Sequence, residues 1–580
     1  MQARRRNGRR LAVTLIALFA VVVVFGIRLV DIQVVQAQEL SAAAANNRNI
    51  TSTVYGARGE IVDANGVVLA DSVNRYDITA SPVASLGKGN AASRDTDIQK
   101  LAQTIGMTEA AVRALLDKDP TSQYVLLAKK MTLDVRNAVV ALGISWVYPR
   151  LDPARTYPNG SVAGNLVGYL GTDGPLAGLE YSENQCIAAQ NGTETYERSA
   201  DSVRLPGSTV TTKAAVDGGT LRLTIDSDLQ YFTQQAIAAQ AKKLKAKWAT
   251  AVIVRVKDGH IMAAADYPSI DPNDVQSTID EYGLGALTSG VFTRTYEPGS
   301  TFKVIAASAL LNEGKATQTT PVVVPPSLKV PGGTISDVTY HPTMHWTTTG
   351  VLVNSSNIGI SQLSKKLSAE KRYGYLRAFG IGSKTAVGFN GEASGLLKNY
   401  QDWDGLTNFT TSFGQGLAVT SAQVASVYQT LGNGGVRMPL TLVEGCQQAD
   451  GTVTDTPSTT GTRVVTKDTA RKVVDMMENV VTQGGLSSTL TVKGYDIAAK
   501  TGTAQVARNG VYTSDRVISV AGLVPGDDPE YAVVVTFGEP TTIRLSSGAA
   551  PTFTDIMNQL IKTYRIAPST HKVPNLPATW

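Results

Sequence analysis

Cysteine and histidine are both scarce in this chain of 580 residues, which has two cysteines and four histidines. Two cysteines far apart in sequence cannot supply the clustered ligands of a structural zinc site, nor the disulfide framework of a small secreted domain. An oxidising compartment would permit a bond between Cys186 and Cys446. The sequence does not establish that bond, and two free thiols are the simpler expectation.

Only one pair of histidines, His341 and His345 in "HPTMH", has the spacing of metal ligands on a helix. Pro342 lies between them, no Glu follows the first, and no further His or Cys is near. We therefore predict loop histidines, and neither a metal nor an organic cofactor. The segment "GIGSKT" (380–385) resembles a phosphate-binding loop but lacks its Gly-Lys-Ser/Thr order, so we predict no phosphate site there.

Charge is also low, at 17% of residues, and the net charge of +5 is local. The first ten residues, "MQARRRNGRR", contain five arginines and no acid, so the remainder of the chain is neutral. A neutral body without arginine-aromatic patterning excludes a basic nucleic-acid-binding face. The composition, with 43% hydrophobic residues, is that of a globular protein, and the length of 580 residues predicts more than one domain.

A long apolar run follows the arginines. Leu11 to Ile27 are seventeen residues without a charge, at the short end of the length of a membrane-spanning helix. The arginines before this run predict that the N-terminus lies inside and the body outside the cell membrane. A cleaved signal peptide is the alternative. No small-residue cleavage site follows directly, which favours an uncleaved anchor.

Short strands and helices alternate in the next part of the chain. Ile61/Val62 and Val67 to Leu69 predict strands joined by a turn at Asn65-Gly66. Residues 95–145 are expected to be helical, since "DIQKLAQTIG" and "EAAVRALLDKD" are amphipathic. Near residue 221 an alternating strand precedes Asp226 and Ser227, one of which should cap a long helix.

The last part of the chain shows strands at both ends of a long helical segment. "ATAVIVRVKDGHIMAAA" predicts a hairpin that turns at Asp258-Gly259. "YDIAAKTGTAQV" and "SVAGLVPGDDPEYAVVVTFGEP" predict further strands, and "TFTDIMNQLIKTYRI" a final helix. This order indicates one antiparallel sheet covered by helices. The tail "APSTHKVPNLPATW" is rich in proline and should be extended.

Serine followed three residues later by lysine occurs four times, at Ser85/Lys88, Ser300/Lys303, Ser368/Lys371 and Ser569/Lys572. Most of these matches must be accidental. Such a pair is usually the start of a helix with a lysine on its surface. Ser300 differs because Pro298-Gly299 breaks the chain before it, so Lys303 shares its helical face. A lysine can take the serine proton only when it is neutral, which requires burial and a second cation nearby.

Two downstream motifs supply the missing parts. "SSN" places Ser355 where a hydroxyl can move a proton, and Asn357 where an amide can hold a lysine or a substrate carbonyl. "KTGT" on a predicted strand gives Lys500 as the second cation, and Thr501 and Thr503 as hydroxyls for a substrate carboxylate. Gly502 should leave room for a substrate backbone beside the strand. Each motif alone is more simply a turn, but the three in this order are typical of penicillin-binding proteins and class A β-lactamases.

With these motifs, the chain resembles the class B penicillin-binding proteins, monofunctional peptidoglycan D,D-transpeptidases. "ARGEIVDANGVVLA", "RTYPNGSVAGNLVGYLG" and "LRLTIDSDLQ" resemble the N-terminal pedestal of that family, and "EPGSTFKV", "SFGQGLAVT" and "KTGTAQV" its transpeptidase domain. "RLVDIQ" after the anchor resembles the FtsI-like cell-division branch rather than the elongation branch, which maintains cell shape.

The resemblance implies an α/β (α+β) fold, in which a penicillin-binding/β-lactamase-like transpeptidase domain has its antiparallel sheet between helices. An elongated mixed α/β pedestal, the dimerisation domain, and one transmembrane helix would precede it. The expected domains are a cytoplasmic basic tail (1–10), the anchor (11–30), the pedestal (31–220), the transpeptidase domain (221–566) and the extended tail (567–580).

The resemblance also implies a mechanism. Ser300 would attack the D-Ala-D-Ala end of a stem peptide, with Lys303 as base, while Ser355, Asn357 and Lys500 complete the catalytic set. Thr501, Gly502 and Thr503 would bind substrate, and the backbone N–H groups of Ser300 and Thr503 would form the oxyanion hole. β-Lactam antibiotics would acylate the same serine. The family often acts in cell-wall synthesis beside a membrane glycosyltransferase of the FtsW type and other division proteins.

Other functions stay open on the same motifs. An elongation-type transpeptidase, a D,D-carboxypeptidase or β-lactamase, a β-lactam-sensing receptor and a division scaffold with dispensable catalysis are the alternatives. A β-lactamase needs a carboxylate to activate the deacylating water. Glu392 and Asp404 are the nearest substitutes for it, and their Gly-, Asn- and Asp-rich surroundings predict exposed loops instead. A receptor would be expected to carry several membrane spans.

Overall fold

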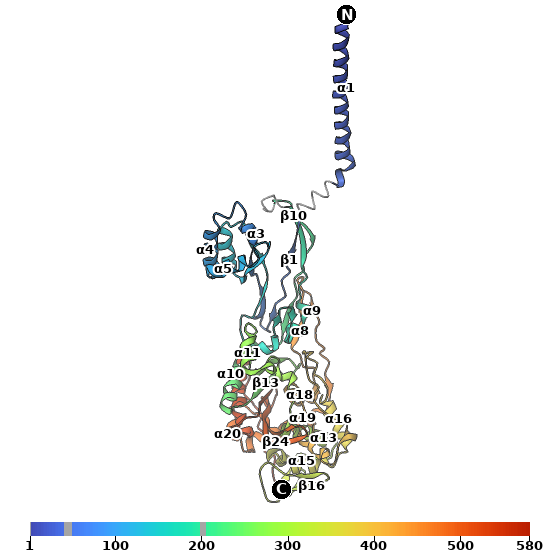
Figure 1. Ribbon diagram of the computed structural model, residues 1–580. Coiled ribbons are helices and arrows are strands. Elements are labelled where there is room, and N and C mark those ends of the chain that lie inside the picture. Colours follow the sequence, from blue (N-terminus) through green and yellow to red (C-terminus); the bar gives the residue numbers. More distant parts are fainter. Residues whose placement is uncertain (1, 40–48, 198–204) are drawn as a thin grey trace. The chain divides into compact units, whose positions relative to one another are not determined.

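The computed structural model describes residues 2–39, 49–197 and 205–580 (Figure 1). The chain divides into two compact units. One comprises Met1–Ala57 and Ala189–Asp217, and the other comprises Arg58–Ala188 and Gly218–Trp580.

The first unit contains the long helix α1 (Gln2–Val30), which continues as a π-helical turn over Asp31–Val35. Gly8–Val35 has a mean hydropathy of 2.7 and is long and apolar enough to cross a membrane. The predicted apolar helix is therefore confirmed. The same unit holds an antiparallel sheet in the order β1 (Asn49–Val54), β10 (Gly192–Glu197) and β11 (Val210–Lys213).

The second unit begins with a small α/β body around β4 (Tyr76–Ala80), which lies between β5 (Val125–Met131) and β6 (Val147–Leu151). Three helices pack with this sheet around Trp146: α4 (Arg94–Ile105), α5 (Glu109–Asp117) and α6 (Leu133–Ala141). The predicted amphipathic helices are confirmed. The expectation that residues 95–145 are helical is wrong over β5, which pairs with the distant β4.

A mixed six-stranded sheet joins segments that are far apart in the sequence. Its order is β21 (Val453–Thr454), β20 (Val443–Gln447), β12 (Thr220–Leu223), β2 (Ile61–Val62), β3 (Val68–Val73) and β7 (Ala154–Thr156). The predicted turn between β2 and β3 is confirmed, and Gly66 supplies its φ of +83°. Cys446 of β20 forms a disulfide with Cys186. The expectation of free thiols is therefore wrong, since the sheet brings together cysteines 260 residues apart.

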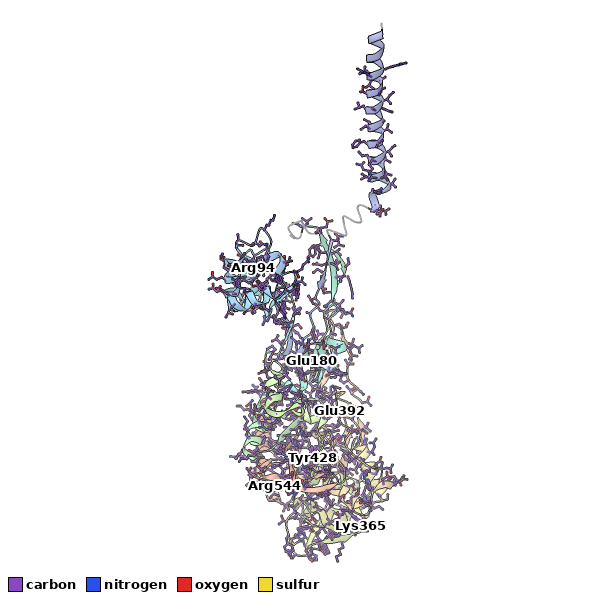
Figure 2. All side chains as sticks on the ribbon, viewed as in Figure 1. Arg94, Glu180, Lys365, Glu392, Tyr428 and Arg544 are labelled. Carbon is purple, nitrogen blue, oxygen red and sulfur yellow. A yellow bond between two sulfur atoms is a disulfide. The ribbon has the colours of Figure 1, made fainter. Side chains whose placement is uncertain are left out.

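A buried ion pair stabilises the chain beside this sheet. Glu180 (Figure 2) has no exposed surface, and its carboxylate accepts from Arg58 Nε at 2.7 Å and from Arg155 Nε at 2.6 Å. A charge buried in this way is tolerated only when it is paired, so loss of either arginine should destabilise the fold.

The third body of the second unit is a five-stranded antiparallel sheet. Its order is β14 (Ile261–Tyr267), β13 (Trp248–Arg255), β25 (Tyr531–Gly538), β24 (Val511–Val524) and β23 (Ala498–Arg508). The predicted hairpins are confirmed. β13 pairs with β25 over its whole length, so this pairing joins the N-terminal and C-terminal strands of the domain in one sheet.

Helices cover both faces of this sheet, as expected. α10 (Ser227–Leu244) and α21 (Ala550–Tyr564) pack on one face. α18 (Ser421–Gly432), α19 (Lys467–Gln483) and α13 (Lys303–Asn312) contribute to the core on the other. Asp226 caps α10, accepting from the amides of Asp228 and Leu229 at 3.1 Å. The predicted cap and the α/β class of the domain are thus confirmed.

Shorter elements complete the second unit. The helices are α3 (Pro82–Ser85), α7 (Gly164–Val167), α8 (Gly178–Ser182), α9 (Asn184–Ile187), α11 (Val275–Tyr282), α12 (Gly290–Thr293), α14 (Thr348–Val353), α15 (Asn357–Ser364), α16 (Ala369–Ala378), α17 (Thr407–Thr410) and α20 (Ser487–Leu490). The strands are β8 (Leu170–Gly171), β9 (Gly174–Pro175), β15 (Pro321–Val324), β16 (Leu328–Val330), β17 (Gly333–Ile335), β18 (Met344–Thr347), β19 (Val436–Arg437) and β22 (Thr462–Arg463).

The proline-rich tail has no helix, and it lies against the domain. Thr579 forms an antiparallel bridge with Trp346 of β18. The carbonyl of Ala578 accepts from the amide of Thr347 at 3.0 Å, and a Cβ on Gly350 would collide with it. The tail therefore supports the entry to α14, the helix that leads to the SSN motif.

Candidate active site

Ser300 lies in a 3-10 turn over Gly299–Phe302, which leads directly into α13. Gly299 takes a φ of +57°, and a Cβ there would lie 3.1 Å from the Cβ of Ala504 on β23. Its amide donates to the carbonyl of Gly414 at 3.0 Å. The turn is thus packed tightly against its neighbours, which holds Ser300 with 8% of its surface exposed.

Lys303, one turn along, is fully buried and contacts all the groups expected of a serine-activating base. Its Nζ donates to Ser300 Oγ at 2.8 Å and to Asn357 Oδ1 at 2.8 Å. It also bonds the carbonyl of Ser355, and Ser355 Oγ is 3.3 Å away. The SSN motif therefore holds the amine directly beside the serine hydroxyl.

Lys500 on β23 reaches the same hydroxyl from the other side. Its Nζ donates to Ser355 Oγ at 2.9 Å, and its side chain is also fully buried. Ser355 Oγ thus lies between two lysine amines, in a position to pass a proton between them.

The electrostatics of this pair favour a neutral Lys303. Burial, and then the positive charge of Lys500, place the pKa of Lys303 well below its usual value, against a smaller opposing effect of Asp337. Burial lowers the pKa of Lys500 to about 7. Both amines therefore release a proton more readily than an ordinary lysine, which makes a free amine next to Ser300 accessible.

Ser355 adopts an unusual backbone conformation, with a φ of +55° between α14 and α15. A non-glycine residue in this region costs about 1–2 kcal/mol. The conformation directs both the carbonyl and the hydroxyl of Ser355 toward the two lysines. Strain of this kind is characteristic of functional sites.

Asp337, which sequence reasoning missed, holds the start of α15. Its carboxylate accepts from Ser356 Oγ at 2.6 Å, and from the amides of Asn357 and Ile358 at 2.6 and 3.0 Å. It also pairs with His341 Nε2 at 2.9 Å. Asp337 lies about twenty residues before the motif, and no local pattern marks it.

His341 is thus an ordered ion-pair partner in a loop. Burial opposes its protonation, but bonds to the Pro342 carbonyl and to Asp337 raise its pKa overall. His345 lies in β18 and its ring packs against that of Trp580, so the expectation of a loop position fails for this second histidine. In the described parts of the chain, no group of three or more His, Cys, Asp or Glu side chains could hold a metal ion.

The KTGT motif forms the free edge of the five-stranded sheet. Thr501 and Thr503 are half-buried, and Thr503 Oγ accepts from the amide of Ser546 at 3.2 Å. A Cβ on Gly502 would lie 2.5 Å from Ser519 Oγ and 3.0 Å from the carbonyl of Pro298. Glycine is therefore needed for close packing behind the strand, a reason different from the expected space for a substrate.

The structure brings together all the residues that the three motifs nominated: Ser300, Lys303, Ser355, Asn357 and Lys500, with Thr501, Gly502 and Thr503 on the adjoining strand. The other three serines have structural partners. Ser368 caps α16, Ser569 donates to Asp527 and Ser85 donates to the carbonyl of Pro82. Of the four serines, all in described segments, Ser300 alone bonds a lysine amine.

Three carboxylates of this domain accept hydrogen bonds from other groups, although one oxygen of Glu297 has no partner among the described residues. Glu297, three residues before Ser300, accepts from the Gly416 amide at 2.8 Å and from Tyr512 Oη at 3.0 Å. Glu392 is only 5% exposed and accepts from Thr385, so the predicted exposed loop is wrong for this residue. Asp404 is exposed as predicted, and accepts from amides at the start of α17.

Comparisons with known families cover most of the chain. Residues 249–558 match the family described as the penicillin binding protein transpeptidase domain. Residues 53–223 match the penicillin-binding protein dimerisation domain.

Individual relatives agree with these matches. Penicillin-binding protein PbpB of Mycolicibacterium smegmatis is 33% identical over 596 residues, covering 97% of this chain and 91% of the relative. Peptidoglycan D,D-transpeptidase FtsI of Escherichia coli is 31% identical over 519 residues, covering 89% of this chain and 85% of the relative. The structure of penicillin-binding protein 3 of Mycobacterium tuberculosis complexed with ampicillin is 29% identical, with a TM-score of 0.71 over 91% of this chain and 100% of that one.

Proposed function

The chain belongs to the class B penicillin-binding proteins, which join a dimerisation domain to a transpeptidase domain, and from this premise we propose that it is a division-type peptidoglycan D,D-transpeptidase. It would cross-link the stem peptides of the cell wall through a serine acyl-enzyme, and bind β-lactams covalently at the same serine. The contact that carries the proposal is the 2.8 Å hydrogen bond between the buried Lys303 amine and Ser300 Oγ.

Acylation begins with the neutral amine of Lys303 taking the proton of Ser300 Oγ. The oxygen attacks the carbonyl carbon of the penultimate D-Ala, and the backbone N–H groups of Ser300 and Thr503 stabilise the oxyanion. A Cβ built on Gly299 would lie 3.3 Å from the carbonyl oxygen of Thr503. The two backbone segments are therefore close enough for this role. One such donor contributes about 10²–10³ in rate.

The peptide bond then breaks and D-Ala leaves. Its nitrogen takes a proton that passes from Lys500 or Lys303 through Ser355 Oγ, which contacts both amines. An amine of a neighbouring stem peptide attacks the resulting ester, gives its proton back through the same groups and forms the cross-link. Ser300 is released with its proton. Asn357 keeps Lys303 in place through both half-reactions. None of these steps requires a cofactor.

Replacing Ser300 by alanine tests the site. Ser300→Ala should abolish covalent labelling by a fluorescent penicillin and leave the melting temperature nearly unchanged, because alanine fits a helical first turn. Ser368→Ala is the matched control, since it removes the serine of another serine-lysine pair and should label normally. Labelling of Ser300→Ala, with the adduct mapped to another serine by mass spectrometry, would show that the assignment is wrong.

We propose that α1 is an uncleaved membrane anchor and that the catalytic domain lies outside the cell membrane. Five arginines precede the apolar run, and the Cys186–Cys446 disulfide is the chemistry of an oxidising compartment. Intact mass of protein from native membranes checks the anchor, and protease protection in right-side-out spheroplasts checks the orientation. A mature chain that starts beyond residue 30 would contradict the uncleaved anchor. A catalytic domain that is protected from the protease would contradict the outside orientation.

The family resemblance also supports a partner. We propose that the first unit, which contains α1, brings this chain to a membrane glycosyltransferase of the FtsW type at the division site. Co-purification from membranes should recover that glycosyltransferase with the full chain. A chain in which an unrelated membrane helix replaces residues 8–35 should lose it. Equal recovery with both chains would place the contact elsewhere.

A further inference from the structure

A cationic cavity lies outside the serine-lysine site. Its volume is about 420 Å³, and it is lined by residues around the end of α16, the start of α18 and the paired strands β19 and β22. The segment 380–385, whose sequence lacks the order of a phosphate-binding loop, forms part of its wall.

Three cations line this cavity, Arg377, Lys384 and Arg437, and no acidic residue does. Within the described residues none of the three forms an ion pair. Arg437 is half-buried, and burial followed by repulsion from Arg377 lowers its pKa. A guanidinium held half-buried beside another without a carboxylate is unfavourable unless an anion compensates it.

The backbone holds the two arginines in place. Arg377 Nη1 donates to the carbonyls of Ile381 and Gly382 at 3.1 and 2.8 Å. Gly380 has a φ of +96°, and the guanidinium of Arg437 lies where a Cβ of Gly380 would be. The glycine therefore makes room for Arg437 at the cavity wall. Arg437 is thus held half-buried by the fold, and Arg377, although exposed, is fixed by its two hydrogen bonds.

One acid, Glu392, interacts with one of these charges. Glu392 accepts from the amide and the hydroxyl of Thr385 at 2.7 and 2.5 Å, and it interacts electrostatically with Lys384. Three cations against one carboxylate leave about two positive charges facing the cavity. The side chains of Ser383, Thr460 and Thr462 add hydroxyl donors to the lining.

We propose that this cavity binds a phosphate monoester. Such a group carries close to two negative charges at neutral pH and offers three acceptor oxygens. Arginine forks match the geometry of phosphate oxygens, and lysine supplies a point charge. Forked guanidiniums, a lysine and hydroxyls around a space of this volume fit a phosphate group carried on a small sugar or polyol.

A chain of hydrogen bonds links the cavity to the segment that precedes Ser300. Gln423 lines it and donates from Nε2 to the carbonyls of Ser383 and Ser394 at 2.8 and 2.9 Å. Gln423 also closes the capping box of α18 with Thr420. The residue before Thr420, Val419, pairs with Tyr296, four residues from the nucleophile. The ligand would therefore contact an element that supports the catalytic turn without entering the reaction.

Titration calorimetry on the full-length chain in detergent tests the proposal. Glycerol 3-phosphate and inorganic phosphate are titrated at pH 8, with sodium chloride holding the ionic strength constant. Saturable 1:1 binding is expected, and Arg437→Gln and Arg377→Gln should each weaken it at least tenfold. Arg463→Gln is the matched control, because Arg463 lies on the adjoining strand β22 and does not line the cavity.

Penicillin labelling of Ser300 at the wild-type rate confirms that each variant is folded. A phosphate diester of similar size, with one negative charge, should bind at least tenfold more weakly than the monoester. Absence of saturable binding, equal affinity in wild type and Arg437→Gln, an equal loss in Arg463→Gln, or equal binding of the diester would each overturn the proposal.

Discussion

Replacing Lys500 by glutamine removes the charge beside Lys303 and keeps a hydrogen-bond donor near Ser355. The nitrogens of Lys303 and Lys500 lie 3.3 and 2.9 Å from the same oxygen, so they are at most about 6 Å apart. Two unit charges at about 6 Å, in an effective dielectric constant of about 20, repel by about 2.8 kcal/mol. This energy corresponds to about two pKa units.

The sign follows from the charges. The cation at Lys500 disfavours a second cation at Lys303, so its loss should raise the pKa of Lys303 by about two units. Only the neutral amine can accept the proton of Ser300. The acid limb of acylation should therefore move to higher pH by about two units, and the rate on that limb should fall about 100-fold at a given pH. Raising the pH should restore this part of the loss.

Stopped-flow acylation by a fluorescent penicillin from pH 5 to 10 measures the effect. The position of the limb reports the pKa of Lys303, and the plateau separately reports what Lys500 does for the leaving group. Lys366→Gln is the control, since Lys366 is an exposed lysine of the same domain. An unchanged limb in Lys500→Gln would refute the reasoning, because burial alone would then set the pKa of Lys303.

Three further outcomes are expected. Asp337→Asn replaces a charged acceptor of the SSN motif, so acylation should slow about tenfold and unfolding should become easier by about 1.5–3 kcal/mol; equal rates and melting temperatures would remove Asp337 from the site. Replacing Cys186 and Cys446 together by serine opens a loop of 260 residues and should cost about 2–5 kcal/mol, as should reduction of the wild type, measured by urea denaturation; coincident oxidised and reduced curves would count against it. A chromogenic cephalosporin should give a burst of about one equivalent and then almost no turnover. Glu297, Glu392 and Asp404 accept hydrogen bonds from other groups, so the general-base activation of water, worth about 10²–10⁴ in rate, is missing. Sustained turnover at many per second would instead indicate a hydrolase.

Local patterns in the sequence predicted much of this structure because local physics determines those parts. The hairpin at Asp258-Gly259 and the cap at Asp226 depend on neighbouring residues, and both are confirmed. The strand β5 was missed because its partner β4 lies about fifty residues earlier. Its short apolar run, followed by two lysines, has no period that separates strand from helix.

The candidate site follows the same division. Three short motifs nominated Ser300, both lysines, Ser355 and Asn357, because each motif combines chemistry with a local break or strand. The disulfide, the Asp337–His341 pair and the packing reason for Gly502 were not predictable. Each depends on residues brought together by the complete fold, and no spacing in the sequence encodes them.

The closure of the five-stranded sheet by β13 and β25 also determines when the enzyme becomes competent. Synthesis runs from the N-terminus, so Ser300 and Lys303 leave the ribosome two hundred residues ahead of Lys500. The β25 partner of β13 follows later still. Until these last strands arrive, the serine has neither its second cation nor the sheet edge beside it. A nascent chain therefore lacks a complete site until these strands are made, and we expect no acylation by a β-lactam before the domain has folded.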